Sequence, residues 1–132
     1  MPVKLNGYEQ RMSMGLIQLI DKIKKHPDYH QAGMILCHNG VVRSTSRDGR
    51  NVSGLTITVD HEKLKRVIEK NKTKPGIIEI LVEIAENRNL FVGDDVMFIV
   101  VAGDIREHVI SVMNDTLNTI KRTVTKKTEF FI

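Results

Sequence analysis

The run Val96-Met97-Phe98-Ile99-Val100-Val101-Ala102 is the clearest structural signal in the sequence, because it is apolar throughout. A strand with one face in water alternates apolar and polar residues, whereas an unbroken apolar run is typical of a central strand buried on both faces. The run is far shorter than a membrane-spanning helix, which needs roughly 20 residues. We therefore expect a sheet centred on residues 96–102 with other elements packed against both of its faces.

A helix should follow this strand. Asp104, with Glu107 three residues later, has the form of a capping box. Apolar residues then recur at helical spacing and predict a helix over about 105–121, which ends at Lys121: Val109, Met113, Leu117 and Ile120. The tail beyond it mixes basic and β-branched residues, and we assign it no element.

Two further helices are expected before the central strand. Ser13 can cap a helix over about 14–25, and Pro27 ends its pattern. Asp60 can cap a second helix, which stops before Lys74-Pro75-Gly76 and has one apolar face made of Leu64, Val67 and Ile68.

Alternating or apolar runs predict the remaining strands, at residues 32–37, 55–59 and 78–84. His38-Asn39-Gly40 should interrupt the first strand as a bulge or bend before Val41-Val42 resumes it. The polar stretch 43–53 is expected to be a mobile loop, and 87–94 a turn region. The resulting order of elements, αββαββα, predicts an α+β fold with a mixed or antiparallel sheet packed with helices, in one domain over 1–132.

The composition limits the classes of function. The net charge is +4 and the sequence pI about 9.3, which permits attraction to anions but does not identify them. Residues 1–11 lack the apolar segment of a signal peptide, so we expect a cytoplasmic protein without a membrane partner. Cys37, the single cysteine, lies in an apolar run and is expected in the core. The histidines show no metal-ligand spacing, so no metal or cofactor is predicted.

Basic residues are what remains to carry chemistry. Arg43 opens a loop after a strand, Arg106 lies in the first turn of the last helix, and Lys121 ends that helix. Lys126 and Lys127 lie in the tail. Any one of them can equally be a solvated surface cation, so their spacing alone predicts no more than a basic α+β domain.

The order of these residues resembles the large subunit of molybdopterin synthase from about His26 to Glu129. The matching pieces are His26-Pro27, Gly33, Gly40-Val41-Val42-Arg43, Gly49, Val52, the strand from Leu55, Leu90-Phe91-Val92-Gly93-Asp94, Arg106, Lys121 and Lys127-Thr128-Glu129. Lys121 falls on the family's catalytic lysine. Lys127 falls on the lysine of its terminal motif if one residue is deleted.

The sequence also departs from the family's pattern. Ala85-Glu86 stands where the family usually has a His-Arg pair, and Ile105 replaces the histidine of a second such pair. Val59-Asp60-His61 replaces a Tyr-rich segment, and the Pro and Trp of the terminal motif are missing.

The resemblance implies an α/β hammerhead type of fold and a role in molybdenum cofactor biosynthesis. Enzymes of the family move sulfur from a thiocarboxylate to cyclic pyranopterin monophosphate, a phosphorylated pterin, and give molybdopterin. The thiocarboxylate ends the C-terminal Gly-Gly tail of a ubiquitin-like small subunit, and two large subunits form a homodimer inside a heterotetramer. The expected substrate-binding residues are Arg43 and Arg106, with Arg106 reaching across the dimer, and the expected catalytic residues are Lys121 and Lys127.

Two other functions stay open on the sequence alone. The changed His-Arg positions favour a non-catalytic paralogue that binds a pterin, an anion or a ubiquitin-like partner. Nucleic-acid binding is disfavoured, because the aromatic residues of the basic tail are limited to Phe130 and Phe131.

Overall fold

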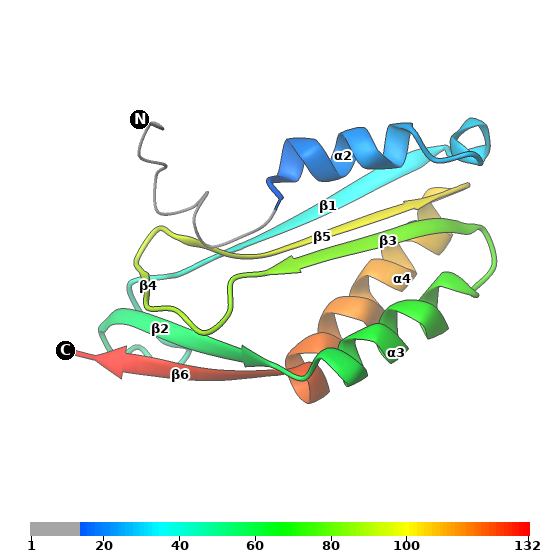
Figure 1. Ribbon diagram of the computed structural model, residues 1–132. Coiled ribbons are helices and arrows are strands. Elements are labelled where there is room, and N and C mark those ends of the chain that lie inside the picture. Colours follow the sequence, from blue (N-terminus) through cyan, green and yellow to red (C-terminus); the bar gives the residue numbers. More distant parts are fainter. Residues whose placement is uncertain (1–13) are drawn as a thin grey trace.

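The computed structural model describes residues 14–132 and has an α+β fold with two three-stranded antiparallel sheets (Figure 1). The elements in chain order are α2 (Leu16–Lys24), the 3-10 turn η1 (Tyr29–Gln31), β1 (Met34–Val41), β2 (Val52–Val59), α3 (His61–Lys72), β3 (Ile77–Ile84), β4 (Leu90–Phe91), β5 (Asp95–Gly103), α4 (Arg106–Thr119), the π-helical turn η2 (Ile120–Val124) and β6 (Thr125–Phe131). The expected fold class is therefore confirmed.

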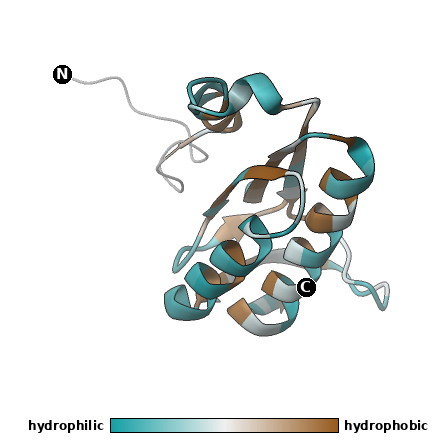
Figure 2. Cartoon of the chain, turned by 90° about the vertical axis from the view of Figure 1, so that its right-hand side faces the viewer, coloured by the Kyte–Doolittle hydropathy of each residue, from teal (hydrophilic) through white to brown (hydrophobic). Residues whose placement is uncertain are grey.

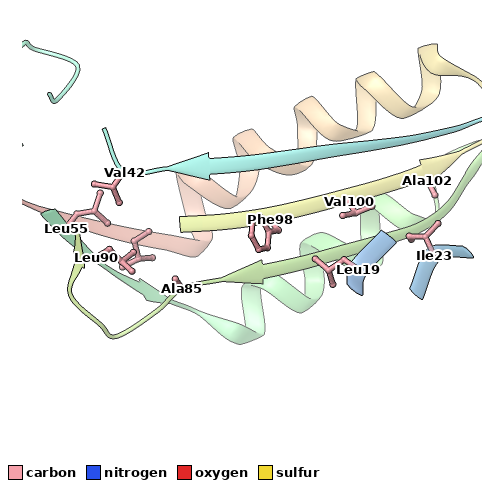
Figure 3. Close-up of a cluster of buried hydrophobic side chains, with 10 residues drawn as sticks. Leu19, Ile23, Val42, Leu55, Ala85, Leu90, Phe98, Val100 and Ala102 are labelled. Atoms are coloured by element: carbon pink, nitrogen blue, oxygen red, sulfur yellow. The ribbon is translucent and has the colours of Figure 1, made fainter. Parts of the chain in front are cut away.

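The larger sheet has the strand order β1-β5-β3, and β5 is buried on both faces, as the apolar run predicts. Phe98, Val100 and Ala102 point to the face that α2 covers, where they join Leu19 and Ile23 in one apolar cluster (Figure 3). We call this group the α2-side cluster. Because side chains alternate along a strand, the residues between Phe98, Val100 and Ala102 must face the other way.

The opposite face of the larger sheet packs against α3 and α4, which lie side by side beneath it (Figure 1). Ile99 and Val101 of β5 belong to the cluster on this face, together with Val109 of α4. A buried hydrogen bond of 2.9 Å from Asn71 Nδ2 to Thr116 Oγ1 ties α3 to α4. The helices carry many hydrophilic residues, while the strands of the sheet are largely hydrophobic (Figure 2).

The smaller sheet has the order β4-β2-β6 and lies at one end of the larger one (Figure 1). Two of its strands correct the expectations from sequence. The tail, to which no element was assigned, forms β6 and pairs with β2 along its length, and the turn region contains the short strand β4. These strands form because distant segments meet, which local periodicity does not show.

The helix starts agree only in part with expectation. The Asp60 carboxylate caps α3 by accepting a hydrogen bond from the Lys63 N–H at 3.1 Å, as predicted. The prediction of a capping box at α4 is wrong, because Ile105 and not Asp104 holds the cap position. The Asp104 carboxylate instead accepts a hydrogen bond from the Ile105 N–H and contacts the His108 ring. At α2 the cap position belongs to Gly15, and the predicted cap Ser13 lies outside the described residues.

The first strand continues through His38-Asn39-Gly40 up to Val41. The predicted irregularity occurs at the end of this segment, as a register shift between Gly40 and Val41. Cys37 packs against the α2-side cluster, and burial raises the pKa of its thiol. Within residues 14–132, no helix has the length and apolar character needed to cross a membrane.

Candidate functional site

Two adjoining hollows of about 690 and 310 Å³ lie where the smaller sheet meets the end of β1. They share their lining at Val41, Arg47, Leu55, Lys121 and Lys127. We call the two hollows together the basic cleft. Arg43, Thr45 and Glu129 complete its wider part, and its narrower part is lined among others by His38, Gly40 and Thr125.

The π-helical turn η2 positions Lys121. Ile120 and Val124 at its two ends are buried to 0% and 3% exposure, so the residues between them are held at the surface. The Val124 carbonyl accepts a hydrogen bond of 2.9 Å from the Asp60 N–H, which fixes the turn to the start of α3. Lys121 therefore projects from a backbone that is anchored on both sides. Such π turns often occur at functional sites.

Strand alternation positions Lys127 and Glu129 on one face of β6. Lys127 pairs with Ile57 of β2, and Glu129 pairs with Leu55. Leu55 and Ile57 are buried in the α2-side cluster, so this face of the smaller sheet turns toward the larger sheet. Lys126 directly precedes Lys127 and must point to the opposite face.

The loop after β1 supplies two arginines. Buried Val42 anchors the loop start through hydrogen bonds of 2.9 Å with Asp94 and Gly93, and Arg43 follows it directly. Arg47 lies farther along, in a turn closed by the bridge between Thr45 and Asn51.

Local contacts hold this loop in shape. Ser46 donates a hydrogen bond to the Asp48 carboxylate, which with the Arg50 backbone N–H holds the pKa of Asp48 below its ordinary value. The Arg50 guanidinium lies 3.5 Å from the centroid of the Phe131 ring. The expected mobile loop is thus tied to the last strand through a cation–π contact.

The charges of the basic cleft are unbalanced. Arg43, Arg47, Lys121 and Lys127 line it, and the acidic residue among the lining residues is Glu129. An open hollow with excess positive charge attracts anions and can hold a phosphate or carboxylate.

His38 lies at the narrow part of the basic cleft. Its Nε2 atom is buried and has no hydrogen-bond partner among the protein groups of the described residues. Burial is the larger cause that lowers the pKa of His38, and the positive charge of Lys121 is the smaller. The ring therefore favours its neutral form.

The structure brings three of the four residues singled out from sequence to one cleft: Arg43, Lys121 and Lys127. Arg106 lies elsewhere, at the start of α4, and its side chain pairs with Glu107 at 3.5 Å. Since α4 rises about 1.5 Å per residue, Arg106 and Lys121 are roughly 20 Å apart along it.

Sequence reasoning missed Arg47, Glu129 and His38 as lining residues. Arg47 stands in a polar loop, where a basic residue carries no distinguishing signal. Glu129 could have been found from its two-residue spacing to Lys127, once the tail was assigned to a strand.

The positions that replace the family's two His-Arg pairs lie outside the basic cleft's lining. Ala85 is fully buried in the core, and Glu86 pairs with His61 at 2.8 Å. Ile105 is half exposed at the start of α4. Among residues 14–132, no three His, Cys, Asp or Glu side chains gather in a way that could hold a metal ion.

Comparison with known proteins gives one family and several similar structures. A family model described as MoaE protein matches residues 13–123. No curated protein sequence matches the chain. A molybdopterin synthase structure from Staphylococcus aureus is similar at a TM-score of 0.73 and 18% identity, covering 90% of this chain and 86% of that chain.

Two further structures have the same fold. Molybdopterin cofactor biosynthesis protein E from Burkholderia multivorans matches with a TM-score of 0.69 and 16% identity over 90% of this chain and 84% of that chain. A complex of subunits 1 and 2 of molybdopterin-converting factor from Helicobacter pylori matches with a TM-score of 0.66 and 16% identity, covering 89% and 84%. At these identities the structures show a shared fold.

Proposed function

Because the chain belongs to the MoaE protein family, we propose that it acts in molybdenum cofactor biosynthesis as the large, catalytic subunit of a molybdopterin synthase. The reaction would move sulfur from the thiocarboxylate of a small ubiquitin-like subunit to cyclic pyranopterin monophosphate. The observation that carries the proposal is the convergence of Arg43, Lys121 and Lys127 on one cleft.

Both reactants of this chemistry are anions. The pterin carries a phosphate ester, and the tail of the small subunit ends in a thiocarboxylate. A guanidinium group can hold a phosphate through two parallel hydrogen bonds, which suits Arg43 at the open side of the basic cleft. The excess of positive charge would attract both reactants.

The two lysines suit different parts of the reaction. Lys121 projects from the anchored turn η2 and would stabilise negative charge, or donate a proton, as the cyclic phosphate opens. Lys127 comes from β6 and would assist at the thiocarboxylate. Both side chains line both hollows, so one bound molecule can meet the two ammonium groups together.

Arg106 requires a second copy of the chain. We propose a homodimer in which Arg106 of one copy serves the basic cleft of the other, because about 20 Å of helix separates it from Lys121 in its own chain. Its side chain is 78% exposed, and its neighbour Glu107 is 66% exposed, so both can meet a partner. The small subunit would bind each copy, in line with the two-subunit complex among the similar structures.

A non-catalytic paralogue is the second candidate, and Ala85, Glu86 and Ile105 favour it. Glu86 is engaged with His61 and Ala85 is part of the core, so neither can replace a proton-transferring histidine. Such a paralogue would keep phosphate binding at the basic cleft but form no molybdopterin. Complementation of a strain that lacks the large subunit separates the two functions.

The direct test is reconstitution with a thiocarboxylated small subunit and cyclic pyranopterin monophosphate. Lys127→Ala should lower the rate of molybdopterin formation at least tenfold (about 1.4 kcal/mol) through the lost charge at the cleft. Lys126→Ala is the matched control, because this neighbour on the same strand points to the other face. Equal rates for the two variants would sink the assignment of Lys127.

A further inference from the structure

The feature that the proposed function does not use is His38. Its Nε2 atom is buried, yet no protein group of the described residues bonds it. Buried polar side-chain atoms usually have a partner, and an unsatisfied one calls for a reason. Here His38 belongs to the lining of the narrower hollow of the basic cleft, together with Lys121 and Lys127.

The local backbone leaves space beside the Nε2 atom of His38. Gly40, two residues along β1, presents the same face of the strand. A Cβ atom at Gly40 would lie 3.3 Å from His38 Nε2, so any side chain there would crowd the ring nitrogen. Glycine at this position keeps the space next to Nε2 open.

Burial and the surrounding charges favour the neutral form of the ring. The charged groups that line the hollow with His38 come from three parts of the chain: Lys121 of η2, Lys127 of β6 and Arg47 of the loop after β1. Among residues 14–132, no carboxylate lines this hollow, so none of these groups favours an imidazolium. Burial and the charge of Lys121 lower the pKa of His38 accordingly. A neutral imidazole nitrogen either donates or accepts one hydrogen bond.

We propose that His38 Nε2 hydrogen-bonds an uncharged polar group of the molecule whose anionic group the basic cleft holds. The ligand class is a heterocycle that bears a phosphate: Arg43, Lys121 and Lys127 bind the phosphate, and His38 reads a ring N–H or carbonyl. This inference rests on the proposed function, in which the heterocycle is the pterin. His38 is then a substrate-binding residue that discriminates the pterin phosphate from other small anions.

The test compares two ligands on four chains by isothermal titration calorimetry: inorganic phosphate and cyclic pyranopterin monophosphate. His38→Phe keeps a planar ring without nitrogens, and His38→Gln places an amide near the position of Nε2. His30→Gln is the matched control, because His30 is exposed in η1 and does not line the basic cleft. Circular dichroism of each variant establishes that it is folded.

We expect His38→Phe to weaken pterin phosphate binding about tenfold, the effect of one lost hydrogen bond, and to leave phosphate binding unchanged. His38→Gln should recover most of the loss, and His30→Gln should equal the unsubstituted chain. An equal loss for both ligands would mean a structural role and would overturn the inference. So would pterin phosphate binding that neither His38 variant alters.

The unsubstituted chain separates this inference from the proposed function. Phosphate binding without pterin phosphate binding would overturn both together. Pterin phosphate binding that leaves the NMR signal of the His38 Cε1–H unmoved would overturn the inference alone. This second measurement needs no folded Phe variant, since the loss of the signal in His38→Gln assigns it.

Discussion

The two sheets of this chain each have three antiparallel strands, but their side chains differ in kind. The central strand β5 of the larger sheet is apolar from Val96 to Ala102 and buried on both faces. The edge strand β6 of the smaller sheet carries Lys126, Lys127 and Glu129, all of which keep contact with solvent. The central strand of the larger sheet thus contributes buried apolar side chains, and the edge strand of the smaller sheet contributes exposed charged side chains.

This difference means that stability and chemistry can be altered separately. A change in the β5 layer should lower the free energy of unfolding without changing the binding of the folded chain. A change at the basic cleft should do the reverse. His38 is the exception, because it stands on a strand of the larger sheet but faces the cleft.

The largest effect is expected from Phe98→Ala. Phe98 is 1% exposed in the α2-side cluster, so its loss leaves a cavity and should lower the free energy of unfolding by about 3–5 kcal/mol. Phe91→Ala is the control in the smaller sheet, where Phe91 is 58% exposed, and should cost below about 1 kcal/mol. Urea unfolding measures both, and similar costs would contradict the division between the sheets.

Lys121→Ala should act on rate and leave stability alone. Removal of a group that stabilises developing charge typically lowers a rate 10²- to 10³-fold (about 2.7–4 kcal/mol), so we expect at least a 100-fold loss of molybdopterin formation. The free energy of unfolding should change by less than about 0.5 kcal/mol, because Lys121 is exposed.

Arg122→Ala is the matched control for that change, since Arg122 follows in the same π-helical turn and lines a different hollow between α3 and α4. Single-turnover kinetics with the thiocarboxylated small subunit gives both rates. Unchanged turnover in Lys121→Ala would remove Lys121 from the catalytic residues.

His38→Phe should weaken ligand binding yet stabilise the fold. The substitution removes a buried nitrogen that bonds no group in the described part of the chain, and an unsatisfied polar atom of this kind costs about 1 kcal/mol or more. We therefore expect the free energy of unfolding to rise by up to about 1 kcal/mol in urea titrations without ligand. A fall of similar size would show that the ring nitrogen is engaged in the ligand-free fold.

The smallest effect concerns pH. The folded chain protonates His38 less readily than the unfolded chain, whose histidine has the ordinary pKa of 6.5. The neutral His38 therefore contributes its full share of stability above pH 6.5. This share is lost as the pH falls from 6.5 toward the lower pKa of His38 in the folded state.

The measurement is the difference in unfolding midpoint between the unsubstituted chain and His38→Phe, followed from about pH 8 to about pH 5. The difference should grow in favour of His38→Phe as the pH falls. A constant difference would contradict the lowered pKa. In Lys121→Ala the pKa of His38 should move back upward, because one of its two causes is removed.

Features that depend on residues close together in the sequence were predicted, and features that depend on distant residues were not. The strand at Val96–Ala102 and the cap at Asp60 were predicted because their signals are local. The strand β6 was missed because residues 125–131 pair with β2, about 70 residues earlier in the chain. Its β-branched and basic residues show no period that marks a strand on their own.

The site was predicted to the extent that the family resemblance covered it. Arg43, Lys121 and Lys127 came from matching positions, and the structure brings them together. His38 could not be predicted as a lining residue, because the sequence does not show which segments lie across from its strand. What lies across from this strand depends on the docking of η2 and β6, which involves segments about 80 residues away.

The π-helical turn η2 has a consequence for how the chain tolerates insertions and deletions. One residue added within α4 would rotate everything after it by about 100° around the helix axis. At η2 an added residue is absorbed as a wider turn, because buried Ile120 and Val124 hold the two ends. We therefore expect that a change of one residue in this turn can alter the interval between Lys121 and Lys127 and still leave both lysines at the basic cleft. A sequence search for two lysines at a fixed interval would therefore miss related chains whose turn has a different length. A comparison of backbone structures would still find them.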